Sequence, residues 1–281
     1  MKLLSICLAA TALTFSTASI QAAPYCNALT SVEELPKKFQ RRGPFYSDQA
    51  SGWIVGSDQL KPTPEVTDEM RLLWSEIKGA FEAQGTQLVV LAAPPRPLFI
   101  SDDDWTVLGL DPRADRAQLR NRFSSYISAL NETGIVAPDL SDLSDQQPNY
   151  YFARDTHWTP IGAAMSVAAL KEALDGQAMP QDWMSGLAPQ TYEEKGSLSM
   201  VVDQTCGSRP EKERAPALDF STKEGAAGLF AKNDPSRVAL IGTSFSDRYQ
   251  RDAYRVADAV AHLFDKDVEN QSLTGGGLVG A

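Results

Sequence analysis

The sequence predicts an α/β fold in which a mostly parallel sheet is covered by helices on both faces. Segments with helical spacing of apolar residues alternate with short apolar runs, a pattern typical of buried parallel strands. The composition is that of an ordinary globular protein, with 43% hydrophobic and 22% charged residues. The length of 281 residues allows one large domain, or one domain with a small appendage.

The first 23 residues have the layout of a secretory signal peptide. Lys2 precedes an apolar run from Leu3 to Phe15, and small residues lead to Ala22 and Ala23. Ser and Thr interrupt the run, which is shorter than the about 20 apolar residues that a transmembrane helix needs. We expect residues 1–23 to be removed on export, with an uncleaved anchor as the alternative.

The first half of the chain contains two predicted amphipathic helices, over residues 67–83 and 113–130. Between them, residues 87–93 read Gln-Leu-Val-Val-Leu-Ala-Ala and precede Pro94-Pro95, which favours a buried strand. Residues 101–112 are acidic and predict a loop. Shorter strands are expected over 52–55 and 135–138.

The second half contains a helix whose ends are marked in the sequence. Thr159 suits the N-cap, Pro160 suits the first helical position, and Gly176 suits the end. Residues 177–236 are expected to be irregular, with one small hairpin. The remaining predictions are a buried strand over 237–241, which Gly242 ends, and a helix over 252–265.

Two cysteines, Cys26 and Cys206, remain once the signal peptide is removed with Cys7. In an oxidising compartment this number suggests one disulfide, and two free thiols are the alternative. Two thiolates are too few for a structural zinc site built from cysteine. We expect no metal and no cofactor.

Histidine is scarce, which narrows the search for a general base to His157 and His262. His262 lies in an apolar helical stretch and is expected to be half-buried. His157 follows Asp155 by two residues in a loop just before a helix. A carboxylate placed there can hold one imidazole nitrogen as a donor and leave the other as an acceptor.

Ser244 follows the strand over 237–241 and Gly242, at the carboxyl end of that strand, where open α/β sheets bind ligands. A serine hydroxyl needs a base such as His157 to become a nucleophile. Peptide N–H groups around the serine can stabilise an oxyanion. The alternative is a Gly-Thr-Ser turn whose hydroxyls satisfy only backbone groups.

Two motifs together resemble a known family. They read Asp155-Thr156-His157-Trp158-Thr159-Pro160-Ile161-Gly162 and, after a strand, Gly242-Thr243-Ser244-Phe245-Ser246. The pair resembles the SGNH-hydrolase-like domain of the alginate O-acetyltransferase family, AlgX and AlgJ, and is more similar to the AlgX-like branch. Shorter matches are Gly52-Trp53-Ile54, the run from Val89 to Arg96 and Gly275-Gly276-Gly277.

The resemblance implies a three-layer SGNH-hydrolase-like domain over residues 24–281, in which Ser244 is the nucleophile, His157 the base and then the acid, and Asp155 the group that orients His157. The order Asp, His, Ser matches this family, whereas common SGNH esterases place the serine first. AlgX-like proteins carry a carbohydrate-binding module after this domain, and the sequence here ends at Ala281 without one.

Three further residues are candidates for substrate binding. Arg96 follows the strand over 87–93 and could pair with a uronate carboxylate. Trp158 could stack on a sugar, and Ser246 could line the nucleophile loop. A surface role for Arg96, core packing for Trp158 and a helix cap for Ser246 are the respective alternatives.

The expected function is periplasmic transfer of acetyl onto hydroxyl groups of an exported, anionic, alginate-like polysaccharide. The expected partners are that polymer, an acetyl donor (a protein or a small molecule) and proteins of a secretion complex. The alternatives are an acetylesterase with the same triad, and a non-catalytic binding or scaffold protein. The net charge of −10 argues against a nucleic-acid partner, and it requires a local basic groove for a polyanion.

Overall fold

The computed structural model describes residues 23–111, 114–145, 149–180, 182–220, 237–247 and 254–275. All but the last residue of the predicted signal peptide lie outside these ranges. The described helices are α1 (Asp68–Glu82), α2 (Asp102–Val107), α3 (Ala114–Glu132), α4 (Pro160–Asp175), α5 (Ser197–Cys206) and α7 (Val256–Phe264). The strands are β1 (Phe45–Ser47), β2 (Ile54–Gly56), β3 (Ala188–Glu194), β4 (Glu213–Asp219), β5 (Val238–Leu240) and β6 (Val268–Asn270), and the 3-10 helices are η1 (Asn27–Thr30), η2 (Val32–Glu34), η3 (Ser57–Leu60), η4 (Arg96–Phe99) and η5 (Leu140–Asp145).

The described strands form three separate two-stranded sheets. The β1–β2 and β3–β4 pairs are antiparallel, and β5–β6 is parallel. The expected strands over 87–93 and 135–138 meet in a single parallel bridge between Val89 and Val136. The prediction of one mostly parallel central sheet is therefore not confirmed. Pro94 and Pro95 have no N–H to donate, so the segment over 87–93 cannot extend its pairing toward its C-terminal side.

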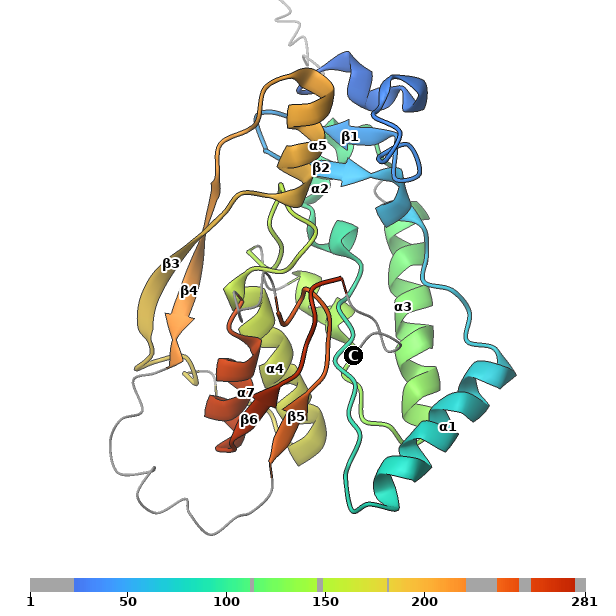
Figure 1. Ribbon diagram of the computed structural model, residues 1–281, viewed down its shortest axis with the longest axis vertical. Helices are drawn as coiled ribbons and strands as arrows, with labels where there is room; N and C mark the ends of the chain where they lie inside the picture. Colours follow the sequence, from blue (N-terminus) through green and yellow to red (C-terminus); the bar gives the residue numbers. More distant parts are fainter. Residues whose placement is uncertain are drawn as a thin grey trace, which may run out of the picture.

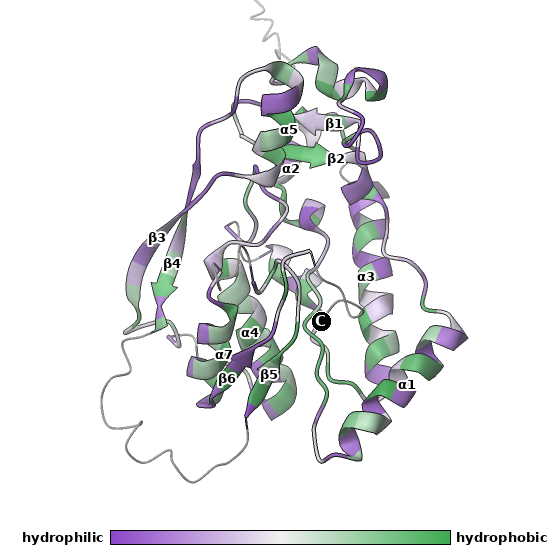
Figure 2. Cartoon of the chain, in the orientation of Figure 1, coloured by the Kyte–Doolittle hydropathy of each residue, from purple (hydrophilic) through white to green (hydrophobic). Residues whose placement is uncertain are grey.

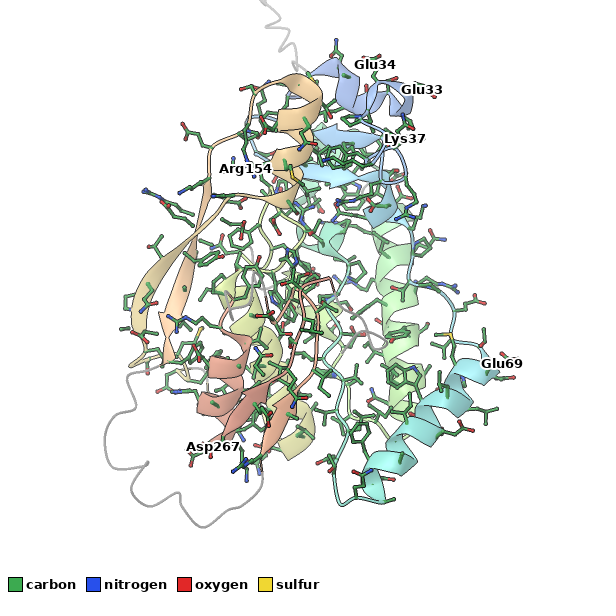
Figure 3. All side chains as sticks on the ribbon, viewed as in Figure 1. Glu33, Glu34, Lys37, Glu69, Arg154 and Asp267 are labelled. Atoms are coloured by element: carbon green, nitrogen blue, oxygen red, sulfur yellow. A yellow bond between two sulfur atoms is a disulfide. The ribbon has the colours of Figure 1, made fainter. Side chains whose placement is uncertain are left out.

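The elements are arranged around the helix α4 (Figure 1). β1, β2 and α5 lie together at one end of the molecule, and the long antiparallel β3–β4 pair runs down one side. α3 and α1 lie on the other side, while α7 and the β5–β6 pair pack beside α4. Strongly charged residues such as Glu33, Glu34, Glu69 and Asp267 lie on the outside (Figure 3).

The helices agree well with the sequence prediction because their caps are local. Thr67 caps α1 by accepting a hydrogen bond from Met70 N, and Thr159 caps α4 by accepting one from Gly162 N. Gly176 ends α4 in the left-handed conformation with φ 68°. The loop predicted over 101–112 is wrong, because Ser101 caps the short helix α2 and three aspartates fill its first turn.

The region expected to be irregular, with one small hairpin, holds an antiparallel pair of strands joined through a helix that was not predicted. β3 and β4 pair over seven residues each, and α5 lies between them in sequence. Figure 2 shows β3 as mostly hydrophilic, in agreement with its exposure along most of its length. The strand β5 is only partly buried, contrary to prediction, and Ile241 beyond it is 49% exposed.

Buried apolar side chains form three clusters. The largest surrounds α4 and includes Trp158 and Tyr254, a second lies under α3, and a third joins the N-terminal segment to β1, β2 and α5. Cys26 and Cys206 pack against the third cluster and form a disulfide with a Cα–Cα distance of 5.8 Å. The predicted disulfide is thus confirmed, and it fixes the end of α5 to the start of the described chain.

Candidate active site

Asp155 and His157 lie on a tight turn that two flanking residues close. Tyr151 and Trp158 form an antiparallel bridge, and Thr159 N donates to Tyr150 O at 2.9 Å. α4 begins immediately afterwards at Pro160, so the turn is held between a bridge and a capped helix. The local sequence therefore fixes where both side chains project.

Asp155 is fully buried and accepts hydrogen bonds through both carboxylate oxygens. Oδ1 receives the backbone N–H of His157 at 2.9 Å and contacts His157 Nδ1 at 2.5 Å. Oδ2 receives the backbone N–H of Ser197, the first residue of α5, at 2.5 Å. A carboxylate at Nδ1 stabilises the tautomer that leaves Nε2 as an acceptor.

Ser244 lies on a turn that follows β5. The N–H groups of Ser246 and Asp247 both donate to Thr243 O at 3.0 Å, which closes this turn around the serine. Asn270 Nδ2, at the end of β6, donates to Ser246 O at 2.9 Å and supports the turn from the neighbouring strand. The parallel β5–β6 pair thus positions the serine at its carboxyl end.

The two turns meet, and Ser244 Oγ lies 2.8 Å from His157 Nε2. The contact expected from the sequence is present, although 87 residues separate the two side chains in the chain. His157 is 7% exposed, whereas Ser244 is partly accessible. This geometry allows the imidazole to take the hydroxyl proton of Ser244 while Asp155 holds the opposite ring nitrogen.

Aromatic side chains enclose the imidazole. Its ring centroid lies 4.8 Å from that of Phe245 and 5.5 Å from that of Tyr254, which is stacked at an interplanar angle of 26°. Trp158 packs edge-on against Phe245 and donates its indole N–H to Phe245 O at 2.9 Å. These contacts link the His157 turn directly to the Ser244 turn.

The structure places Arg96 inside the protein, beneath the Asp155–His157 turn. It is 4% exposed and donates to the backbone oxygens of Ile54, Phe152 and Ala153 and to Gln59 Oε1. Burial lowers the pKa of Arg96 to about 10, and the carboxylates of Glu213 and Asp155 oppose that shift. These hydrogen bonds favour a supporting role for Arg96. Arg96 is nevertheless among the residues that line the groove beside the site, and its contact with a substrate carboxylate stays a prediction.

The other two candidates for substrate binding are also buried. Trp158 is 3% exposed and belongs to the core beside the site. The Ser246 hydroxyl lies 2.7 Å from Ser272 Oγ, so it joins the Ser244 turn to the segment after β6. Both arrangements favour packing and positioning, and direct contact of either residue with substrate stays a prediction.

A groove of about 660 Å³ lies next to the site. Thr156 and Phe245, the neighbours of His157 and Ser244, line it together with Tyr151, Tyr126 and Lys61. The groove offers room for a substrate beside the serine. Tyr126 and Lys61 were not singled out from the sequence, because no motif spacing connects them to the site.

Several supporting groups were likewise missed from the sequence. Ser197 donates its backbone N–H to Asp155, and its hydroxyl oxygen accepts the N–H of Thr156 at 3.3 Å. Asn270 and Tyr254 reach the site from distant segments. Across the described ranges, no cluster of three or more His, Cys, Asp or Glu side chains is arranged to hold a metal ion. None of the helices in those ranges has both the length and the apolar character needed to cross a bilayer.

A serine turn at the end of a parallel strand pair, facing an Asp-supported histidine, is the arrangement of the SGNH-hydrolase-like class. The family model for the SGNH hydrolase-like domain of acetyltransferase AlgX matches residues 50–281. The chain therefore belongs to the AlgX family of SGNH-hydrolase-like domains, as the resemblance of its two motifs indicated.

Two relatives illustrate the range of similarity. An alginate biosynthesis protein AlgX from Pseudomonas syringae pv. tomato is 28% identical over 266 residues, which cover 91% of this chain and 54% of the relative. A probable alginate O-acetylase AlgJ from Pseudomonas putida is 29% identical over 213 residues, covering 69% of this chain and 53% of the relative. The chain thus spans about half the length of these relatives.

Solved structures support the fold. The structure of Pseudomonas aeruginosa AlgX matches 90% of this chain and 59% of its own with a TM-score of 0.67 at 21% identity. The O-acetyltransferase domain of Pseudomonas putida AlgJ matches 80% of this chain and 78% of its own with a TM-score of 0.52 at 22% identity. At these identities the likeness establishes the fold.

Proposed function

We propose that this protein is an O-acetyltransferase that moves an acetyl group, through a serine acyl-enzyme, onto hydroxyls of an exported polysaccharide. The observation that carries the proposal is the 2.8 Å contact between Ser244 Oγ and His157 Nε2, with Asp155 on the other ring nitrogen. The names of the relatives point to alginate as the polymer, and mannuronate residues are the proposed acceptor.

In the first half-reaction, Ser244 Oγ attacks the acetyl carbonyl carbon while His157 Nε2 takes the hydroxyl proton. Asp155 stabilises the imidazolium that forms. The Ser244 N–H makes no hydrogen bond to another described residue and is available to the developing oxyanion. His157 then returns the proton to the leaving group of the donor, and the acetyl ester of Ser244 remains.

In the second half-reaction, a sugar hydroxyl bound in the groove beside Thr156 and Phe245 attacks the acetyl ester. His157 takes the proton of that hydroxyl and returns it to Ser244 Oγ. Because water can take the place of the sugar, exclusion of water by the bound polymer decides between transfer and hydrolysis. We place this reaction in the periplasm, with an acetyl donor and secretion proteins as partners.

The proposal is tested with a chromogenic acetate ester and with deacetylated polymannuronate. The wild type should release the chromophore, and Ser244→Ala should lose this activity to the level of the buffer. With polymer present, mass spectrometry should find acetyl bound to the sugar. Free acetate alone would indicate an esterase, and equal background rates in both proteins would indicate a binding or scaffold protein.

A further inference from the structure

Glu194 is a buried acid that the proposed reaction does not use. It lies at the end of β3 and is 4% exposed. Its Oε2 accepts hydrogen bonds from the hydroxyls of Tyr192 and Tyr254, both at 3.3 Å, and its Oε1 accepts one from Gly196 N at 3.1 Å. Burying a carboxylate costs free energy, and these three hydrogen bonds compensate part of that cost while they link Glu194 to three other groups.

The first connection leads from Glu194 to Asp155 along the backbone. Gly196 N is bound to Glu194, and the next residue, Ser197, donates its N–H to Asp155 Oδ2 at 2.5 Å. Gly196 has φ 78°, and a Cβ on it would lie 2.4 Å from Arg154 O, so glycine is required there.

The Arg154 carbonyl holds the same turn from the other side. Figure 3 shows Arg154 beside α5, and its carbonyl accepts the N–H groups of Leu198 and Ser199. Glu194 therefore fixes the turn that supplies the donor for Asp155.

The second connection leads from Glu194 to His157 through a ring. Tyr254 is fully buried, its hydroxyl is bound to Glu194, and its ring is stacked on the imidazole at a centroid distance of 5.5 Å. Tyr192 packs edge-on against Tyr254 at 5.9 Å and binds the same carboxylate oxygen. The hydrogen bond to Glu194 restrains the tyrosine ring from sliding sideways on the imidazole.

We propose that Glu194 is a positioning residue that fixes both Asp155 and His157, the first through the Gly196–Ser197 turn and the second through Tyr254. One carboxylate thus sets the mutual orientation of the acid and the imidazole without touching substrate. Its catalytic consequence rests on the proposed function. Its geometric consequence, a fixed orientation of His157, does not.

The test compares Glu194→Ala with Glu193→Ala. Glu193 is the adjacent acid, and it is partly exposed and paired with Lys212 and Arg214 at the surface. Glu194→Ala should lower kcat for ester turnover by about 100-fold with KM changed less than about twofold, because misplacement of the imidazole affects the chemical step. Glu193→Ala should leave both parameters unchanged. Glu194→Gln keeps one acceptor oxygen and should fall between the two.

Tyr254→Phe provides a milder variant that keeps the ring and removes only its hydroxyl, and it should lower kcat by about 10-fold. Thermal unfolding of each variant separates loss of folding from loss of positioning. If Glu194→Ala does not fold, Glu194→Gln and Tyr254→Phe carry the test.

A spectroscopic measurement decides the proposal independently of activity. The chain has only two histidines, His157 and His262, so the Cε1–H region of the imidazole correlation spectrum of tag-free protein contains two cross-peaks, one for each residue. The His157 cross-peak should move in Glu194→Ala, Glu194→Gln and Tyr254→Phe but not in Glu193→Ala, and that of His262 should stay. An unchanged His157 cross-peak in these variants overturns the proposal. A wild type without ester turnover would instead contradict the proposed function, and the spectrum would still decide this inference.

Discussion

The Asp155 side chain accepts hydrogen bonds on two sides, and only a carboxylate provides an acceptor oxygen on both. Its Oδ1 faces the N–H and Nδ1 of His157, and its Oδ2 faces the N–H of Ser197. All three contacts need acceptors when His157 carries its proton on Nδ1. The complete burial of Asp155 makes each lost acceptor costly, because water cannot replace it.

Asp155→Asn should therefore lower kcat by about 10⁴-fold, because Asn has one acceptor oxygen, and its amide nitrogen must face either His157 Nδ1 or the Ser197 N–H as a second donor. KM should change little, since Asp155 does not reach the groove. Steady-state turnover of an acetate ester measures both parameters. Asp142→Asn is a matched control, because this acid is highly exposed. A kcat for Asp155→Asn within tenfold of the control would contradict this role.

The sequence predicted the three residues that meet in the candidate site but not the residues that hold them in position. Asp155, His157 and Ser244 could be found because residue type and motif order carry the information. The sequence left the places of Arg96, Trp158 and Ser246 open between substrate contact and other roles. It could not predict their burial, because burial depends on distant segments that pack against them. Glu194 and Tyr254 had no signal at all, since their role depends on how β3 and α7 pack.

Among the helices, α4 supports the candidate site most directly. It starts directly after the His157 turn, and its first turn packs against the strand segment before that turn. Gly162 makes this approach possible, because a Cβ on it would lie 2.1 Å from Tyr150 O. The backbone oxygen cannot move away without disturbing the Tyr151–Trp158 bridge.

Gly162→Ala should destabilise the protein by about 3 kcal/mol, as expected for overpacking against backbone. Gly79→Ala is the matched control in the last turn of α1, where no atom lies within 4 Å of the added Cβ. It should increase stability by about 1 kcal/mol, because alanine favours the helix. Urea unfolding of both variants measures these changes. Equal midpoints for the two variants would contradict the proposed close packing at Gly162.

The elements differed in how well the sequence predicted them. α1, α3 and α4 were found because caps and helical spacing are local. The single sheet is not confirmed, because strand pairing joins distant segments, and among the described residues the expected strand over 87–93 makes one bridge. α5 was missed because its N-terminus has a glycine without a capping side chain.

The disulfide joins two segments that are far apart in the sequence. It joins residues 180 apart in sequence, and α5, which it holds at one end, presents the N–H of Ser197 to Asp155 at the other. The cluster around the disulfide is separate from the large cluster around α4, so the covalent bond stabilises a part of the fold with a small core of its own.

Replacing both cysteines, as Cys26→Ser with Cys206→Ser, should lower the free energy of unfolding by about 5 kcal/mol, the value that loop-closure entropy predicts for a loop of this length. Denaturant unfolding of the double variant measures the change, with reduced wild type as a second comparison. An unfolding midpoint equal to that of the oxidised wild type would show that the bond adds nothing to the fold.

The central claim is that Ser244 becomes acetylated during turnover. The most direct measurement treats the protein with an activated acetyl ester in the absence of polysaccharide, stops the reaction with acid, and maps the peptides by mass spectrometry. We expect an acetyl group on Ser244 in the wild type and none on the corresponding peptide of Ser244→Ala. Turnover in the wild type without any acetyl on Ser244, and persisting in Ser244→Ala, would contradict it.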